Sequence, residues 1–99
     1  MNINKKLEGG RLNIALEGRL DTITAPQLES EIRSSINEVT ELDFDFKDLT
    51  YVSSAGLRVL LSAQKIMNKQ GKMTIRNANE DIMDIFEVTG FIDILNIEE

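Results

Sequence analysis

The feature that most constrains the fold is a change of hydrophobic period in the middle of the chain. Residues 41–46 alternate leucine or phenylalanine with acidic residues, which is typical of a strand buried on one face. From Leu57 onward the apolar residues recur at helical spacing. Between the two patterns lies the sequence Ser-Ser-Ala-Gly at residues 53–56. The change of period therefore predicts a strand, a loop and a helix in succession.

The Ser-Ser-Ala-Gly segment has the composition of a helix N-terminus. A serine oxygen can accept a hydrogen bond from the free N–H groups of the first turn, and we expect Ser53 to cap the helix in this way. Gly56 follows inside the helix, where glycine costs roughly 0.5–1 kcal/mol relative to alanine. This cost indicates that another group comes close to the backbone at Gly56, and packing against a neighbouring segment is the simplest explanation.

The same two periods predict the rest of the fold. Strands separated by a helix need crossover connections, so such neighbours should be parallel. One face of the 41–46 strand is acidic, so helices should cover mainly the other face. We therefore predict one α/β domain over residues 1–99, with two layers and a mixed sheet of about five strands. The predicted elements are strands at 2–8 and 11–17, a helix from a Thr24–Gln27 capping box to Val39, the strand at 41–46, a helix at 54–70, a strand at 72–76, a helix from an Asn79 cap to Gly90 and a strand at 92–97.

Composition weighs against several classes of function. The chain has no cysteine and no histidine, which removes thiolate metal sites and the Ser-His-Asp triad. No lysine lies within residues 48–61 to activate a serine, and no glycine-rich nucleotide motif is present. We therefore expect a protein that is not an enzyme and holds no cofactor or metal.

Charge and the N-terminal sequence bear on partners and location. The formal net charge of −6 disfavours binding to nucleic acid and to anionic membrane surfaces. The first residues lack the apolar core of a signal peptide, and no apolar run reaches the length of a membrane span. We expect a cytoplasmic protein whose partners are other proteins.

Three further segments, read together, form a recognisable pattern. They are Glu-Gly-Arg-Leu-Asp-Thr-Ile-Thr-Ala-Pro at 17–26, Thr-Tyr-Val-Ser-Ser-Ala-Gly-Leu at 50–57 and Ile-Phe-Glu-Val-Thr-Gly-Phe at 85–91. In order and spacing they resemble the landmarks of STAS domains, in particular the small bacterial anti-sigma-factor antagonists. The resemblance covers essentially the whole chain. It implies a compact α/β sandwich, which is the fold class that the patterning predicts.

The resemblance also implies a phosphorylation switch in sigma-factor-dependent transcription. In these antagonists, a partner that is both serine kinase and anti-sigma factor phosphorylates a serine of the second landmark. The unmodified antagonist binds that partner and frees the sigma factor, the phosphorylated form does not bind, and a phosphatase restores it. Alignment on Gly56-Leu57 places the phosphorylated residue at Ser54, with Ser53 as the less favoured position.

The resemblance further assigns a partner-binding surface. Asp21 matches an acidic residue of the family that lies beside the phosphorylated serine. The chain departs from the family pattern at Ser53, where aspartate is usual, and at Ala55, where a second hydroxyl is usual. Taken without the resemblance, Asp21 could equally be a turn residue or a helix cap, and Arg58 a solvated side chain or a partner contact. The candidate surface comprises Asp21, Ser53, Ser54, Ala55, Gly56 and Arg58.

A second function stays open at this point. A STAS domain can also be an unphosphorylated scaffold, or a small-ligand-binding subunit of a larger regulatory or lipid-transport assembly. Serine rather than aspartate at position 53 is the observation that keeps this alternative. A neighbouring gene for a small kinase-like ATPase would favour the antagonist, and one for a transporter permease would favour the alternative.

Overall fold

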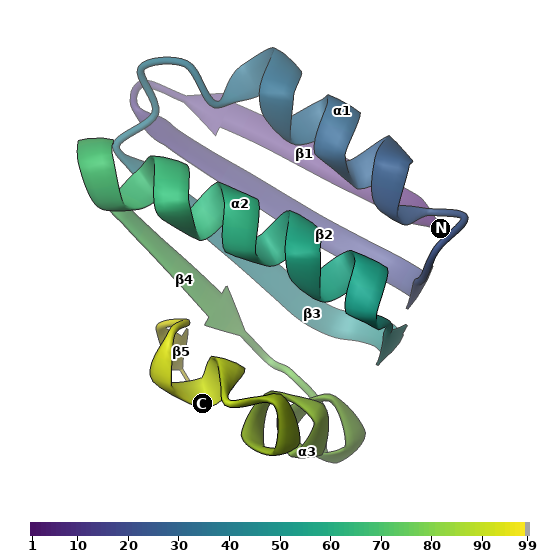
Figure 1. Ribbon diagram of the computed structural model, residues 1–99. Coiled ribbons are helices and arrows are strands. Elements are labelled where there is room, and N and C mark those ends of the chain that lie inside the picture. The colour runs from purple at the N-terminus through teal and green to yellow at the C-terminus, as the bar shows by residue number, and fades with distance from the viewer. Residues whose placement is uncertain (99) are drawn as a thin grey trace.

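A computed structural model describes residues 1–98, in which five strands form one mixed sheet in the order β1-β2-β3-β4-β5 (Figure 1). The first two strands form an antiparallel hairpin through Gly9-Gly10, and each later strand adds parallel to its predecessor. The predicted mixed α/β sheet is therefore confirmed. The strands are β1 (Asn2–Glu8), β2 (Arg11–Leu20), β3 (Glu41–Val52), β4 (Lys72–Arg76) and β5 (Ile97–Glu98).

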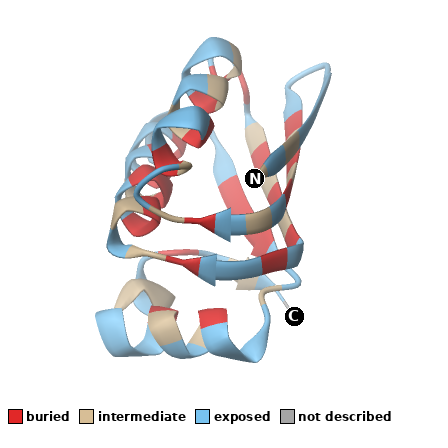
Figure 2. Ribbon diagram, turned by 90° about the vertical axis from the view of Figure 1, so that its right-hand side faces the viewer, coloured by how far each residue is buried: buried red, intermediate tan, exposed pale blue. Residues whose placement is uncertain are grey.

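Two helices cover one face of this sheet, and a third lies at its edge. Helices α1 (Ala25–Ser35) and α2 (Ser54–Gln70) lie side by side with their buried sides toward the strands (Figures 1 and 2). Helix α3 (Glu80–Thr89) packs against the second half of β3, which extends beyond its pairing with β4. Between helices and sheet lies one apolar core in which Phe44, Phe46 and Leu60 are fully buried.

The opposite face of the sheet carries ion pairs instead of a helix. Arg11 on β2 pairs with Glu41 and approaches Asp43, both on β3, and Arg76 on β4 approaches Asp43 from the other side. The acidic side of the 41–46 strand is thus the uncovered side, as predicted. Within residues 1–98, no helix is both long and apolar enough to cross a membrane.

Several predicted element bounds were wrong. Strands β2 and β3 continue to Leu20 and Val52, beyond the predicted ends at 17 and 46, because the two ends pair with each other. Helix α1 ends at Ser35 and not at Val39, since the chain turns through a left-handed Glu38 with φ of 67°. Val39 is buried as predicted, but from the loop after the helix.

The predicted strand at 92–97 is also wrong over most of its length. After the left-handed Gly90, residues Phe91–Asp93 form a 3-10 helix, η1, whose Phe91 and Ile92 pack partly buried against the core. Only Ile97–Glu98 joins the sheet as β5. Residues 91–95 therefore adopt a helical turn, in which Leu95 reaches the core.

Candidate functional site

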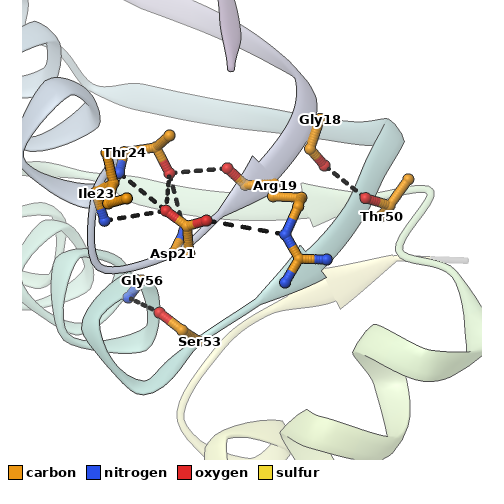
Figure 3. A network of polar contacts seen from close by, with 8 residues as sticks. All are labelled: Gly18, Arg19, Asp21, Ile23, Thr24, Thr50, Ser53 and Gly56. Carbon is orange, nitrogen blue, oxygen red and sulfur yellow. Dashed lines mark hydrogen bonds and ion pairs between the residues drawn. The ribbon is translucent and has the colours of Figure 1, made fainter.

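Ser53 caps helix α2, as the sequence predicts. Its backbone is extended, with φ of −92° and ψ of 176°, and its Oγ accepts a hydrogen bond from the Gly56 N–H at 3.3 Å (Figure 3). Its carbonyl oxygen accepts from the Leu57 N–H at 2.9 Å, which begins the helical ladder. The Ser53 hydroxyl is therefore partly buried and engaged in the structure of the helix terminus.

Ser54 is the first residue of α2 and is exposed to solvent. The first turn of α2 contains no acidic residue, so the positive end of the helix dipole is not compensated by a carboxylate there. The two neighbouring serines thus differ in role. Ser53 stabilises the helix terminus, whereas Ser54 offers a hydroxyl that an external group can reach.

Gly56 is buried and holds the start of α2 against the end of β2. A Cβ at this position would lie 2.6 Å from Leu20 Cγ, which is too close for the Leu20 side chain to remain in place, and 3.1 Å from the Leu20 carbonyl oxygen, which is a tight contact. The same carbonyl oxygen accepts a hydrogen bond from the Ser53 N–H at 2.8 Å. Gly56 is therefore required by the packing of the fold. A large residue there would displace Leu20 before it met a partner, so such a variant cannot test an interface.

The loop after β2 therefore lies directly beside the start of α2, as expected for the loop that contains Asp21 (Figure 3). Asp21 Oδ1 accepts from the N–H groups of Ile23 at 3.0 Å and Thr24 at 3.1 Å. The hydrogen bond from the Thr24 N–H keeps the pKa of Asp21 below its ordinary value. Asp21 is thus ionised at neutral pH and fixes the turn that leads into α1.

The capping box predicted at Thr24 does not form. The Thr24 hydroxyl accepts from the Asp21 N–H at 2.8 Å and donates to the Arg19 carbonyl oxygen at 2.8 Å. The side chain of Thr24 makes no cap hydrogen bond to α1. Its hydroxyl stabilises the turn before the helix instead of the first turn of the helix.

The sequence pattern did not single out three residues that lie in or beside this turn. The Arg19 guanidinium lies over the Tyr51 ring, 4.3 Å from its centroid, and its Nε is 3.8 Å from Asp21 Oδ2. Ile23, inside the turn, is 87% exposed. Arg19 and Tyr51 are register partners on β2 and β3, a pairing that appears only when both strands extend beyond their predicted ends. The exposure of Ile23 had no signal in the sequence.

Ala55 and Arg58 complete the set of predicted residues. Ala55 is partly buried against the core, so only part of its surface is open to a partner. Arg58 is exposed one turn after Ser54, and within residues 1–98 it forms no ion pair. The structure therefore places the turn that contains Asp21 next to the start of α2, which carries Ser54 and, one turn later, Arg58. Which of them touches a partner stays a prediction.

A hollow on the uncovered face of the sheet is the other candidate for a binding site. It measures about 510 Å³ and is lined by charged, polar and apolar residues of β1 to β4. Asp43 lies 4.0 Å from both Arg11 and Arg76, while Asp45 accepts from the Asn77 amide at 3.0 Å, which lowers the Asp45 pKa. These carboxylates are engaged with their neighbours. In the described part of the chain, no group of three or more acidic residues converges as a metal site would require.

Comparison with known proteins identifies a family for this chain. The family model described as STAS domain matches residues 2–99. An anti-sigma-B factor antagonist of Bacillus subtilis is 28% identical over 98 residues, which cover 98% of this chain and 90% of that protein.

Solved structures show the same fold. An anti-sigma factor antagonist from Mycobacterium paratuberculosis superposes with a TM-score of 0.86 at 18% identity, covering 97% of this chain and 83% of that one. The Bacillus cell fate determinant SpoIIAA in its phosphorylated form superposes with a TM-score of 0.77 at 19% identity, covering 99% and 92%.

Proposed function

This chain belongs to the STAS domain family, and from that premise we propose that it is an anti-sigma factor antagonist whose partner is a serine kinase. Relatives that match it nearly end to end are named anti-sigma factor antagonists. In this proposal the protein is a cytoplasmic binding module without enzymatic activity. Its unmodified form binds the anti-sigma factor kinase and so releases the sigma factor, and a phosphatase reverses its inactivation.

The observation that carries this proposal is that the two neighbouring serines have different structural roles. Ser53 is used as the cap of α2, whereas Ser54 is exposed as the first helical residue. A kinase can therefore transfer a phosphoryl group to Ser54 without removing the cap. We propose Ser54 as the phosphorylated residue, with Asp21 and Arg58 as contacts of the kinase around it.

Phosphorylation at Ser54 should act on the interface and leave the fold intact. A phosphoserine adds about −1.5 to −2 charges at pH 7. At a helix N-terminus this charge is favourable by roughly 0.3–1 kcal/mol. In an interface formed around a neutral hydroxyl, however, an unpaired dianion costs several kcal/mol, and each ~1.4 kcal/mol is a tenfold loss of affinity. The modification therefore releases the partner while the domain stays folded.

The test is a phosphorylation assay that incubates this protein and ATP with each small serine-kinase ATPase encoded in the same genome. We expect intact-mass spectrometry to show one added phosphate, and peptide mapping to place it on Ser54. The Ser54→Ala variant should take no phosphate but still bind the kinase, and the Ser53→Ala variant should still be phosphorylated. Phosphate found on Ser53 would move the phosphorylation site from Ser54 to Ser53 and leave the proposed function standing. Absence of both phosphorylation and binding with every such kinase of the genome would overturn the proposal in favour of a scaffold or ligand-binding subunit.

A further inference from the structure

We propose that Ile23 is the apolar anchor of the interface with the kinase, an inference that rests on the proposed function and adds the residue that carries affinity. Ile23 is 87% exposed, so nearly all of its side chain is available to a partner. A single exposed apolar residue is common on protein surfaces and needs more than exposure to indicate an interface. Three further features distinguish Ile23.

The first feature is that the backbone around Ile23 is fixed. Asp21 Oδ1 accepts from the N–H groups of Ile23 and Thr24, and Thr24 Oγ1 ties the turn to Arg19 and Asp21 (Figure 3). The turn thus uses a network of side-chain hydrogen bonds to hold an apolar residue outward. A residue held in place loses little conformational entropy when a partner covers it, which is what makes a good anchor.

The second feature is position. The turn is joined to the start of α2 through Leu20, whose carbonyl oxygen accepts from the Ser53 N–H and whose side chain packs on Gly56. Figure 3 shows the turn and the first turn of α2 next to each other. A partner that places its active site on Ser54 therefore has Ile23 within the area of an ordinary protein interface.

The third feature is a set of ordered polar and aromatic side chains that begins at Asp21, the residue that accepts from the Ile23 N–H. Arg19 is held between the Tyr51 ring, 4.3 Å away, and Asp21 Oδ2, 3.8 Å away. The anchor residues of interfaces are typically accompanied by nearby contacts that add little energy but exclude water, and Arg19 and Tyr51 are ordered side chains that can make such contacts. The structure thus points to an apolar pocket on the kinase that receives Ile23, with polar groups on the Asp21 side of that pocket that meet Arg19.

The experiment compares Ile23→Ala with Val88→Ala in binding of the unphosphorylated protein to the kinase by calorimetry. Val88 is a matched control because it is 88% exposed but lies in α3, outside the turn. We expect the Ile23→Ala variant to bind about tenfold more weakly, as loss of most of a buried aliphatic side chain predicts. The Val88→Ala variant should bind within twofold of the wild type, and Ile23→Leu should restore most of the affinity.

The outcomes separate this inference from the proposed function. Binding of Ile23→Ala within twofold of the wild type would overturn the anchor and leave the antagonist function standing. A wild type that neither binds nor is phosphorylated would overturn both. Both variants should keep the melting temperature of the wild type, because each changes an exposed side chain. Equal weakening by Ile23→Ala and Val88→Ala would also contradict a specific anchor.

Discussion

Helices α2 and α3 begin in the same way but carry opposite charge. Each starts after an extended residue whose side chain accepts from the third N–H of the helix, Ser53 from Gly56 at 3.3 Å and Asn79 from Ile82 at 2.8 Å. The first turn of α3 contains two acidic residues, whereas that of α2 contains none. Over their lengths, α3 has only acidic charges and α2 only basic ones.

The difference shows which helix terminus is suited to a reversible charge. Acidic residues in the first turn of α3 compensate its dipole permanently. In α2 the corresponding position is the neutral hydroxyl of Ser54, so a negative charge can be added there and removed again. The third helical position differs as well, since α3 buries Ile82 there and α2 buries only the backbone of Gly56.

The strongest way to remove this difference is to give α2 the acidic first turn of α3. We expect Ser54→Asp to weaken binding to the kinase by more than tenfold, because a charge enters an interface that accommodates a hydroxyl. Its melting temperature should stay the same or rise slightly, since the charge lies at the positive end of the helix dipole. Calorimetric binding and thermal unfolding measure the two effects.

The matched control for Ser54→Asp is Ser30→Asp, which adds the same charge at an exposed position in the middle of α1. That variant should bind the kinase as the wild type does. If Ser54→Asp instead lowered the melting temperature strongly while Ser30→Asp did not, Ser54 would be a structural residue and the comparison with α3 would fail.

The next largest effect should come from Gly56→Ala. Alanine is the better helix former by roughly 1 kcal/mol, so propensity alone predicts stabilisation. The added Cβ, however, meets Leu20 Cγ at 2.6 Å, and overpacking of this kind typically costs about 1–3 kcal/mol. We expect net destabilisation, measured as a lower midpoint of urea unfolding. A higher midpoint would show that Leu20 can move aside and that Gly56 is not needed for packing.

The sequence predicts the fold well because its hydrophobic periods are regular. Alternation over 41–46 and helical spacing after Leu57 correctly place β3 and α2, and the Ser53 cap follows from local chemistry. Residues 18–20 of β2 and 47–52 of β3 were missed since there only some residues face the core, and the alternation is broken by register shifts between the two strands. Pairing between the two strands keeps these segments in the sheet, and a local hydrophobic pattern does not predict such pairing.

The site was predictable only in part, for a related reason. Resemblance brought Asp21 and Ser54 to attention, and the Leu20 contact indeed places their segments side by side. Local sequence suggested a capping box at Thr24, but the path of the turn places the Thr24 hydroxyl where it donates to the Arg19 carbonyl oxygen. The exposure of Ile23 depends on how that turn leaves β2. The hydrogen bond of Thr24 and the exposure of Ile23 depend on tertiary geometry, whereas helix caps and hydrophobic periods depend on the local sequence.

A smaller effect separates the two caps themselves. Ser53→Ala removes one hydrogen bond to the first turn of α2, while Asn79→Ala removes the equivalent bond in α3 and also the bond from its amide to the Leu49 carbonyl oxygen at 3.2 Å. Loss of a cap costs about 0.5–2 kcal/mol. We expect both variants to unfold at lower urea concentration, and Asn79→Ala to be the less stable of the two. The reverse order would mean that the Ser53 cap contributes more than its longer hydrogen bond suggests.

The smallest expected effect concerns Arg58, which lies four residues after Ser54 and so on the same side of α2. In the unmodified protein a cation near the helix N-terminus is slightly unfavourable, but after phosphorylation it becomes an i,i+4 partner of the phosphate worth about 0.3–0.5 kcal/mol. Phosphorylation should therefore raise the melting temperature of the wild type more than that of Arg58→Gln. Lys65→Gln, which removes a cation two turns further along α2, should behave as the wild type. An equal rise in all three would show that the phosphate is stabilised by the helix dipole alone. Arg58 would then be left free to meet the partner, and its role would have to be sought in the salt dependence of binding.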